Sequence, residues 1–145
     1  MKKIFIFYLI LIPFFCSSQS NYAKETLGIW VGSMSGGDLP SKKIKIVITK
    51  ATYKSGKTGY CEGYSMVNNS NKTYFTGNLF VECDSPQIEG FEPKTNPKNG
   101  IFNLTWGCFD EECFESEENL DGSCCGTWIS YDKNIKRKII VRKIK

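Results

Sequence analysis

The segment Lys43-Ile44-Lys45-Ile46-Val47-Ile48-Thr49-Lys50 alternates apolar and polar side chains almost without interruption. Successive side chains of an extended strand point to opposite faces, so Ile44, Ile46 and Ile48 share one face. This alternation predicts a half-buried β-strand at residues 43–50 rather than a helix.

The same alternation recurs along the chain, between clusters of Gly, Pro, Asn and Asp. Turn-forming residues at 68–71 and 132–134 each join two such stretches, as in β-hairpins. The expected strands are residues 26–33, 43–50, 58–67, 73–83, 87–92, 101–106, 125–131 and 136–144. No window shows a helical period, and residues 20–26 are expected to form a short leader. The spacing predicts an all-β fold, an antiparallel up-and-down β-barrel of about eight strands, with a β-sandwich as the alternative.

The first 19 residues have the layout of a secretory signal peptide. A basic start, Met1-Lys2-Lys3, precedes an apolar run from Ile4 to Phe15 that is too short to span a bilayer. We expect cleavage near residues 18–20, a soluble secreted or periplasmic product, and a single domain over residues 20–145. The alternative is lipid attachment at Cys16, which would anchor the protein in the cell envelope and is the one membrane association we expect.

The chain contains no histidine. Ser-His-Asp and Cys-His catalysis are therefore excluded, as are zinc and haem sites with His ligands. Paired carboxylates can still catalyse glycoside hydrolysis, but here they gather in one loop instead of on facing strands. We expect a binding protein that is not an enzyme and needs no cofactor. Residues 20–145 hold 17 basic and 15 acidic residues, and this balance gives no support for a nucleic-acid partner.

Glycine and tryptophan are paired at two places in the sequence. Leu27-Gly28-Ile29-Trp30-Val31-Gly32 opens the first expected strand, and Gly126-Thr127-Trp128 repeats the Gly-x-Trp pattern near the end. This opening resembles that of the lipocalin and avidin β-barrels, the calycin group, and of small exported proteins of the Bacteroidota. In the calycin group the tryptophan plugs one end of the barrel and the glycine permits close approach of the chain. The resemblance implies a lipocalin-like binding protein for a small or mid-sized apolar ligand.

Aromatic side chains are the candidates for lining a ligand pocket. Tyrosine and tryptophan combine a large apolar surface with a polar tip, which suits a semi-polar ligand. The alternative is that the aromatic side chains simply fill the interior, because a barrel of eight strands can do either. The pocket candidates are Trp30, Tyr64, Phe102, Trp106 and Trp128.

The segment from Cys108 to Cys125 contains seven carboxylates and no basic residue. So many negative charges close together can attract a basic partner, bind Ca²⁺, or keep the tip of a loop solvated. The spacing does not match an EF-hand, and we expect no metal site. The alternative function is an inhibitor or immunity-type module that contacts a basic protein through this loop. The contact candidates are Asp110, Glu111, Glu112, Glu115, Glu117, Glu118 and Asp121.

Six cysteines follow the signal peptide, and an even number in an exported domain predicts disulfides rather than zinc. Cys124 and Cys125 are adjacent, so on a strand they point to opposite faces and reach different partners. If the strand before residue 108 pairs with the strand after residue 124, two bridges close the acidic loop and Cys61 pairs with Cys83. We expect a disulfide-stapled monomer with three bridges among Cys61, Cys83, Cys108, Cys113, Cys124 and Cys125.

The last expected strand is strongly basic. Arg137 and Lys143 share a face with Ile139 and Val141. Such charges commonly protect an edge strand from aggregation, and contact with nucleic acid or anionic lipid is the alternative.

Overall fold

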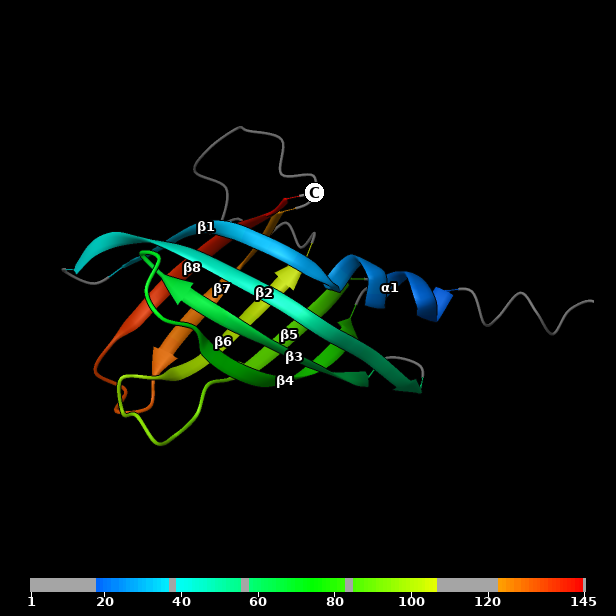
Figure 1. Ribbon diagram of the computed structural model, residues 1–145. Coiled ribbons are helices and arrows are strands. Elements are labelled where there is room, and N and C mark those ends of the chain that lie inside the picture. The colour runs from blue at the N-terminus through cyan, green and yellow to red at the C-terminus, as the bar shows by residue number, and fades with distance from the viewer. Residues whose placement is uncertain (1–17, 37–38, 56–57, 83–84, 107–122, 145) are drawn as a thin grey trace, which may run out of the picture.

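The computed structural model describes residues 18–36, 39–55, 58–82, 85–106 and 123–144 of the chain. A short helix precedes eight strands that wrap into a barrel, and the helix lies at one end of it (Figure 1). In chain order the elements are α1 (Ser18–Thr26), β1 (Gly28–Gly36), β2 (Leu39–Ser55), β3 (Thr58–Val67), β4 (Thr73–Glu82), β5 (Ser85–Phe91), β6 (Gly100–Trp106), β7 (Ser123–Ser130) and β8 (Lys136–Ile144). No helix within these ranges is long and apolar enough to cross a membrane.

Every strand pairs antiparallel with the next one, and β8 returns to pair with β1. The predicted up-and-down barrel of eight strands is therefore confirmed, and the sandwich alternative is wrong. The interpretation of the basic residues in β8 as protection of an edge is also wrong. Since β8 hydrogen-bonds to both β7 and β1, it has no free edge to protect.

Helix α1 was not predicted, because its sequence is polar and lacks a helical apolar period. A helix of this length is marginal by itself, so its contacts with the barrel must hold it. The residues that make those contacts lie at its C-terminal end and are described below.

The middle of the barrel is filled by its own side chains. Phe75 and Phe102 meet edge to face, with 4.7 Å between ring centroids. The rings fit because inward positions opposite them are glycines: a Cβ on Gly63 would lie 2.7 Å from the Phe75 ring, and a Cβ on Gly90 would overlap the Phe102 ring. The buried cluster comprises Trp30, Met34, Ile44, Ile46, Ile48, Cys61, Phe75, Leu79, Ile88, Phe102, Leu104, Trp106, Cys124, Trp128, Ile139 and Val141.

A buried carboxylate closes the end of the barrel away from α1. Glu92 follows β5 and is 8% exposed. Its Oε1 accepts a hydrogen bond from Ser65 Oγ (2.9 Å), and its Oε2 accepts from Gly100 N (2.8 Å) and Trp128 Nε1 (3.2 Å). The Tyr131 hydroxyl donates to the Glu92 carbonyl oxygen at 2.6 Å. This arrangement ties β3, β6 and β7 together at one point.

The cysteines depart from the expected framework. Cys61 points into the core, fully buried beside Gly77, and is a free thiol, so the expected bridge to Cys83 is not present. Cys124 faces inward and Cys125 does not, as predicted for neighbours on a strand. No disulfide joins two of the cysteines that the structure describes. Cys83, Cys108 and Cys113 lie outside the described residues, and the other bridges stay predictions.

Burial of Cys61 makes stability depend on pH. Burial raises the pKa of the Cys61 thiol from 9.0 to about 12. The folded state therefore holds this proton more tightly than the unfolded state, and the associated stability is complete below pH 9. We expect it to fall by about 1.4 kcal/mol per pH unit as the pH rises from 9 towards 12.

Urea unfolding of the parent protein and of Cys61→Ala across this pH range measures the effect, because the tyrosines and lysines that also titrate there are present in both proteins. A parent curve that runs parallel to that of Cys61→Ala would contradict the prediction.

Candidate functional site

The Gly-x-Trp opening builds the end of the barrel at which α1 lies. Gly28 joins α1 to β1 with φ +132°, a conformation that favours glycine. Two residues later, Trp30 points inward and is 2% exposed. Its Nε1 donates to the Thr26 carbonyl oxygen at 3.1 Å, which attaches the last residue of α1 to the barrel.

Lys143 secures the same helix from the opposite end of the sequence. It lies opposite Trp30 in the pairing of β1 with β8, and its Nζ is 5.6 Å from the centre of the Trp30 ring. The Nζ donates to the carbonyl oxygens of Lys24 (3.1 Å) and Glu25 (2.8 Å). Carbonyls of the last helical turn lack partners within the helix, and a cation there also complements the helix dipole. Desolvation lowers the pKa of Lys143.

Replacing Lys143 with Met should release α1 while leaving the barrel closed. The variant loses both hydrogen bonds to the helix and the ammonium above Trp30, at a cost of about 1 kcal/mol for groups near the surface. Amide hydrogen exchange should accelerate in residues 22–27 and remain unchanged in β3 and β4. Lys136→Met, an exposed position on β8, is the control with the same change of charge. Equal protection of residues 22–27 in both variants would show that Lys143 does not hold the helix.

Two buried polar atoms at this end have no hydrogen-bond partner within the described part of the chain. One is Trp106 Nε1, and the other is the Tyr53 hydroxyl. Trp106 is 8% exposed and meets Trp30 edge to face, 5.0 Å between centroids. The Tyr53 ring lies 6.3 Å from that of Tyr22 on α1. Burial raises the pKa of the Tyr53 hydroxyl, and the neighbouring Thr26 side chain partly offsets this effect. Leaving such a group unpaired typically costs about 1–3 kcal/mol, so each needs an explanation.

The candidate pocket residues lie at four different places in the barrel. Trp30 and Trp106 come together at the α1 end. Phe102 lies in the core at the middle of the barrel. Trp128 lies at the far end, where its indole N–H donates a hydrogen bond to Glu92. Tyr64 lies on the outer wall, packed against Tyr74 with Lys72 Nζ 4.4 Å from its ring centre.

Sequence reasoning missed Tyr53, Thr26 and the role of Lys143 at this site. A signal for Lys143 existed, since it shares a strand face with Ile139 and Val141, both buried. Tyr53 carried no such signal, because the bulge near Lys50 that turns it inward is not visible in the sequence.

The acidic contact candidates, residues 110–121, lie outside the described residues, so their role stays a prediction. The loop that contains them begins after β6 and ends before β7. Trp106 at the end of β6 pairs with Cys124 near the start of β7. Its base is thus at the same end of the barrel as α1. Within the described ranges, no three or more Cys, Asp or Glu side chains gather in a way that could hold a metal ion.

Comparisons with protein-family models, with curated proteins and with solved structures found no match for this chain. The closed antiparallel barrel of eight strands is consistent with a calycin-type fold, in agreement with the Gly-x-Trp resemblance.

Proposed function

We propose that the protein is an exported, lipocalin-like binding protein that holds a small ligand at the α1 end of its barrel. The observation that carries the proposal is Trp106 Nε1, which is buried against Trp30 and has no hydrogen-bond partner among the described residues. The ligand has an apolar body, which packs against Trp30 and Trp106, and an acceptor for the indole proton. Because the middle of the barrel is filled, the ligand is small and lies beneath α1 instead of along the barrel axis.

The proposal predicts different effects on stability when two tryptophans are replaced by phenylalanine. Trp106→Phe removes an N–H that has no partner, so the ligand-free protein should keep its stability or gain a little. Trp128→Phe removes an N–H that donates to Glu92 and should lower stability by about 1–2 kcal/mol. Urea unfolding of both variants tests this contrast.

Binding itself is tested by extracting the natively expressed protein with organic solvent and identifying what is released by mass spectrometry. The released compound should raise the melting temperature of the parent protein, and Trp106→Phe should lose most of that rise. If nothing is released and Trp106→Phe is as destabilising as Trp128→Phe, the indole has an ordered partner such as water and the proposal fails.

A second role, contact with a basic protein through residues 108–125, rests on the seven carboxylates in the sequence. Its candidate residues follow Trp106 in the sequence, and the loop that carries them starts and ends at the same end of the barrel as Trp30 and Trp106. Export with removal of residues 1–19 fits either role and would leave the docked end of α1 in place.

A further inference from the structure

A pocket of about 520 Å³ lies on the outside of the barrel wall, over β2, β3 and β4. Its volume is within the range of sites for small molecules. It is separate from the α1-end site, whose tryptophans point into the barrel. The residues that line it are Lys50, Thr52, Lys54, Thr58, Gly59, Tyr60 and Asn78.

One row of side chains crosses the centre of this pocket. The pairing of β2 with β3 and of β3 with β4 sets Thr52, Tyr60 and Asn78 side by side. Directly paired positions have Cβ atoms about 5 Å apart, so one ligand can contact all three. The Tyr60 ring offers a flat apolar face, and the hydroxyl and amide on either side offer donors and acceptors.

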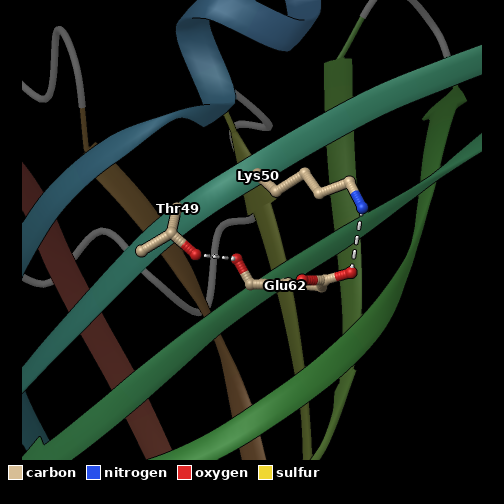
Figure 2. A network of polar contacts seen from close by, with 3 residues as sticks. All are labelled: Thr49, Lys50 and Glu62. Carbon is tan, nitrogen blue, oxygen red and sulfur yellow. Dashed lines mark hydrogen bonds and ion pairs between the residues drawn. The ribbon is translucent and has the colours of Figure 1, made fainter.

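Two lysines flank this row. Lys50 and Lys54 both project outward from β2, two residues before and after Thr52. The register of β2 shifts between Ile48 and Lys50, and Figure 2 shows Thr49 and Lys50 both reaching across to Glu62 on β3. Thr49 Oγ1 donates to the Glu62 carbonyl oxygen at 3.2 Å, which fixes the bulge.

The ammonium group of Lys50 already has one acidic partner, Glu62. Its Nζ lies 3.1 Å from Glu62 Oε1 and 5.8 Å from the centre of the Tyr60 ring. Both partners are about half exposed, at 56% and 43%, so the ion pair is weak and an anion can compete with Glu62 for Lys50. Lys54 has no ion-pair partner among the described residues.

We propose that this outer pocket binds an acidic saccharide. The pyranose ring stacks on Tyr60, its hydroxyls exchange hydrogen bonds with Thr52, Thr58 and Asn78, and its carboxylate or sulfate lies between Lys50 and Lys54. Lysine suits this role, since its ammonium acts as a compact point charge. A neutral sugar lacks the charge contact, and an inorganic anion lacks the stacking contact.

The pocket is less well suited to single-stranded nucleic acid. Sites of that kind combine several aromatic platforms for successive bases with a continuous basic track for the backbone. Here a single ring, Tyr60, lines the pocket, and the acidic Glu62 lies beside it.

Titration calorimetry of the full-length mature protein with four probes tests the proposal: tetragalacturonate, a heparin tetrasaccharide, maltotetraose and an eight-residue oligothymidylate. We expect at least one of the two acidic saccharides to bind about tenfold more tightly than maltotetraose at physiological salt. Lys54→Met and Tyr60→Leu should each weaken that binding about three- to fivefold. Glu62→Gln should strengthen it by about twofold or more, because it removes the competing carboxylate.

Lys45→Met is the matched control, since Lys45 is on β2 opposite Met66 and outside the pocket. It makes the same change of charge as Lys54→Met and should alter the affinity less than Lys54→Met does. The proposal is overturned if neither acidic saccharide binds, if Lys45→Met and Lys54→Met have equal effects, or if the oligothymidylate binds more tightly than both saccharides. A loss of binding in Glu62→Gln would likewise show that Glu62 does not compete with the saccharide for Lys50.

Discussion

Glu92→Ala should lower the free energy of unfolding by about 4 kcal/mol, close to what a small domain can tolerate. The substitution removes the acceptor of three hydrogen bonds at once and leaves Ser65 Oγ, Gly100 N and Trp128 Nε1 buried without a partner. Each hydrogen bond to a charged group contributes about 1.5–3 kcal/mol, but three that share one acceptor are not additive. Urea unfolding monitored by circular dichroism measures the loss.

Glu92→Gln separates the hydrogen bonds from the charge. An amide oxygen in the place of Oε2 still accepts from Gly100 and Trp128, and the amide nitrogen can donate to Ser65 because a hydroxyl also accepts. We therefore expect Glu92→Gln to cost about 1–2 kcal/mol, similar to Ser65→Ala, which removes one donor. If Glu92→Ala costs no more than Ser65→Ala, the carboxylate does not hold the three strands together.

Glu92 also shows why this end of the barrel could not be predicted. In the sequence it is one carboxylate at the end of the expected strand 87–92, and nothing indicates that it is buried. Its partners Ser65 and Trp128 lie 27 and 36 residues away, so only the closed barrel brings them together.

Local signals predicted most of the strands well. β3 and β8 have the boundaries expected from the sequence, since turn residues mark them: Asn68, Asn69 and Lys133 all adopt positive φ in the connecting turns.

The expected strand at residues 43–50 stopped short of the true β2, which runs from Leu39 to Ser55. After the bulge near Lys50 the inward positions change from even to odd numbers, so Ala51 and Tyr53 follow Ile48 on the inner face. A period of two cannot be traced through such a shift, so the inward direction of Tyr53 could not be predicted from the sequence.

Gly90→Ala should destabilise the protein by about 3 kcal/mol, although alanine normally improves a strand position by removing the entropy cost of glycine. The new methyl group would overlap the Phe102 ring. That ring is 1% exposed and packs edge to face against Phe75, so moving it aside would disturb the packing of the core. The sign of the effect is therefore diagnostic: a loosely filled barrel would accept the methyl group and become slightly more stable.

The double variant Gly90→Ala, Phe102→Leu makes the test specific to this contact. Phe102→Leu alone opens space and should cost about 1–2 kcal/mol, and the combination should cost at least 1 kcal/mol less than the two single effects together, because the smaller side chain vacates the place that the methyl group takes. Urea unfolding of the four proteins gives the coupling. Additive effects would mean that the middle of the barrel has room to spare, and a ligand could then lie along its axis. Strong coupling would mean that the middle is closed, which leaves the α1 end as the interior region where Trp30 and Trp106 can meet a ligand.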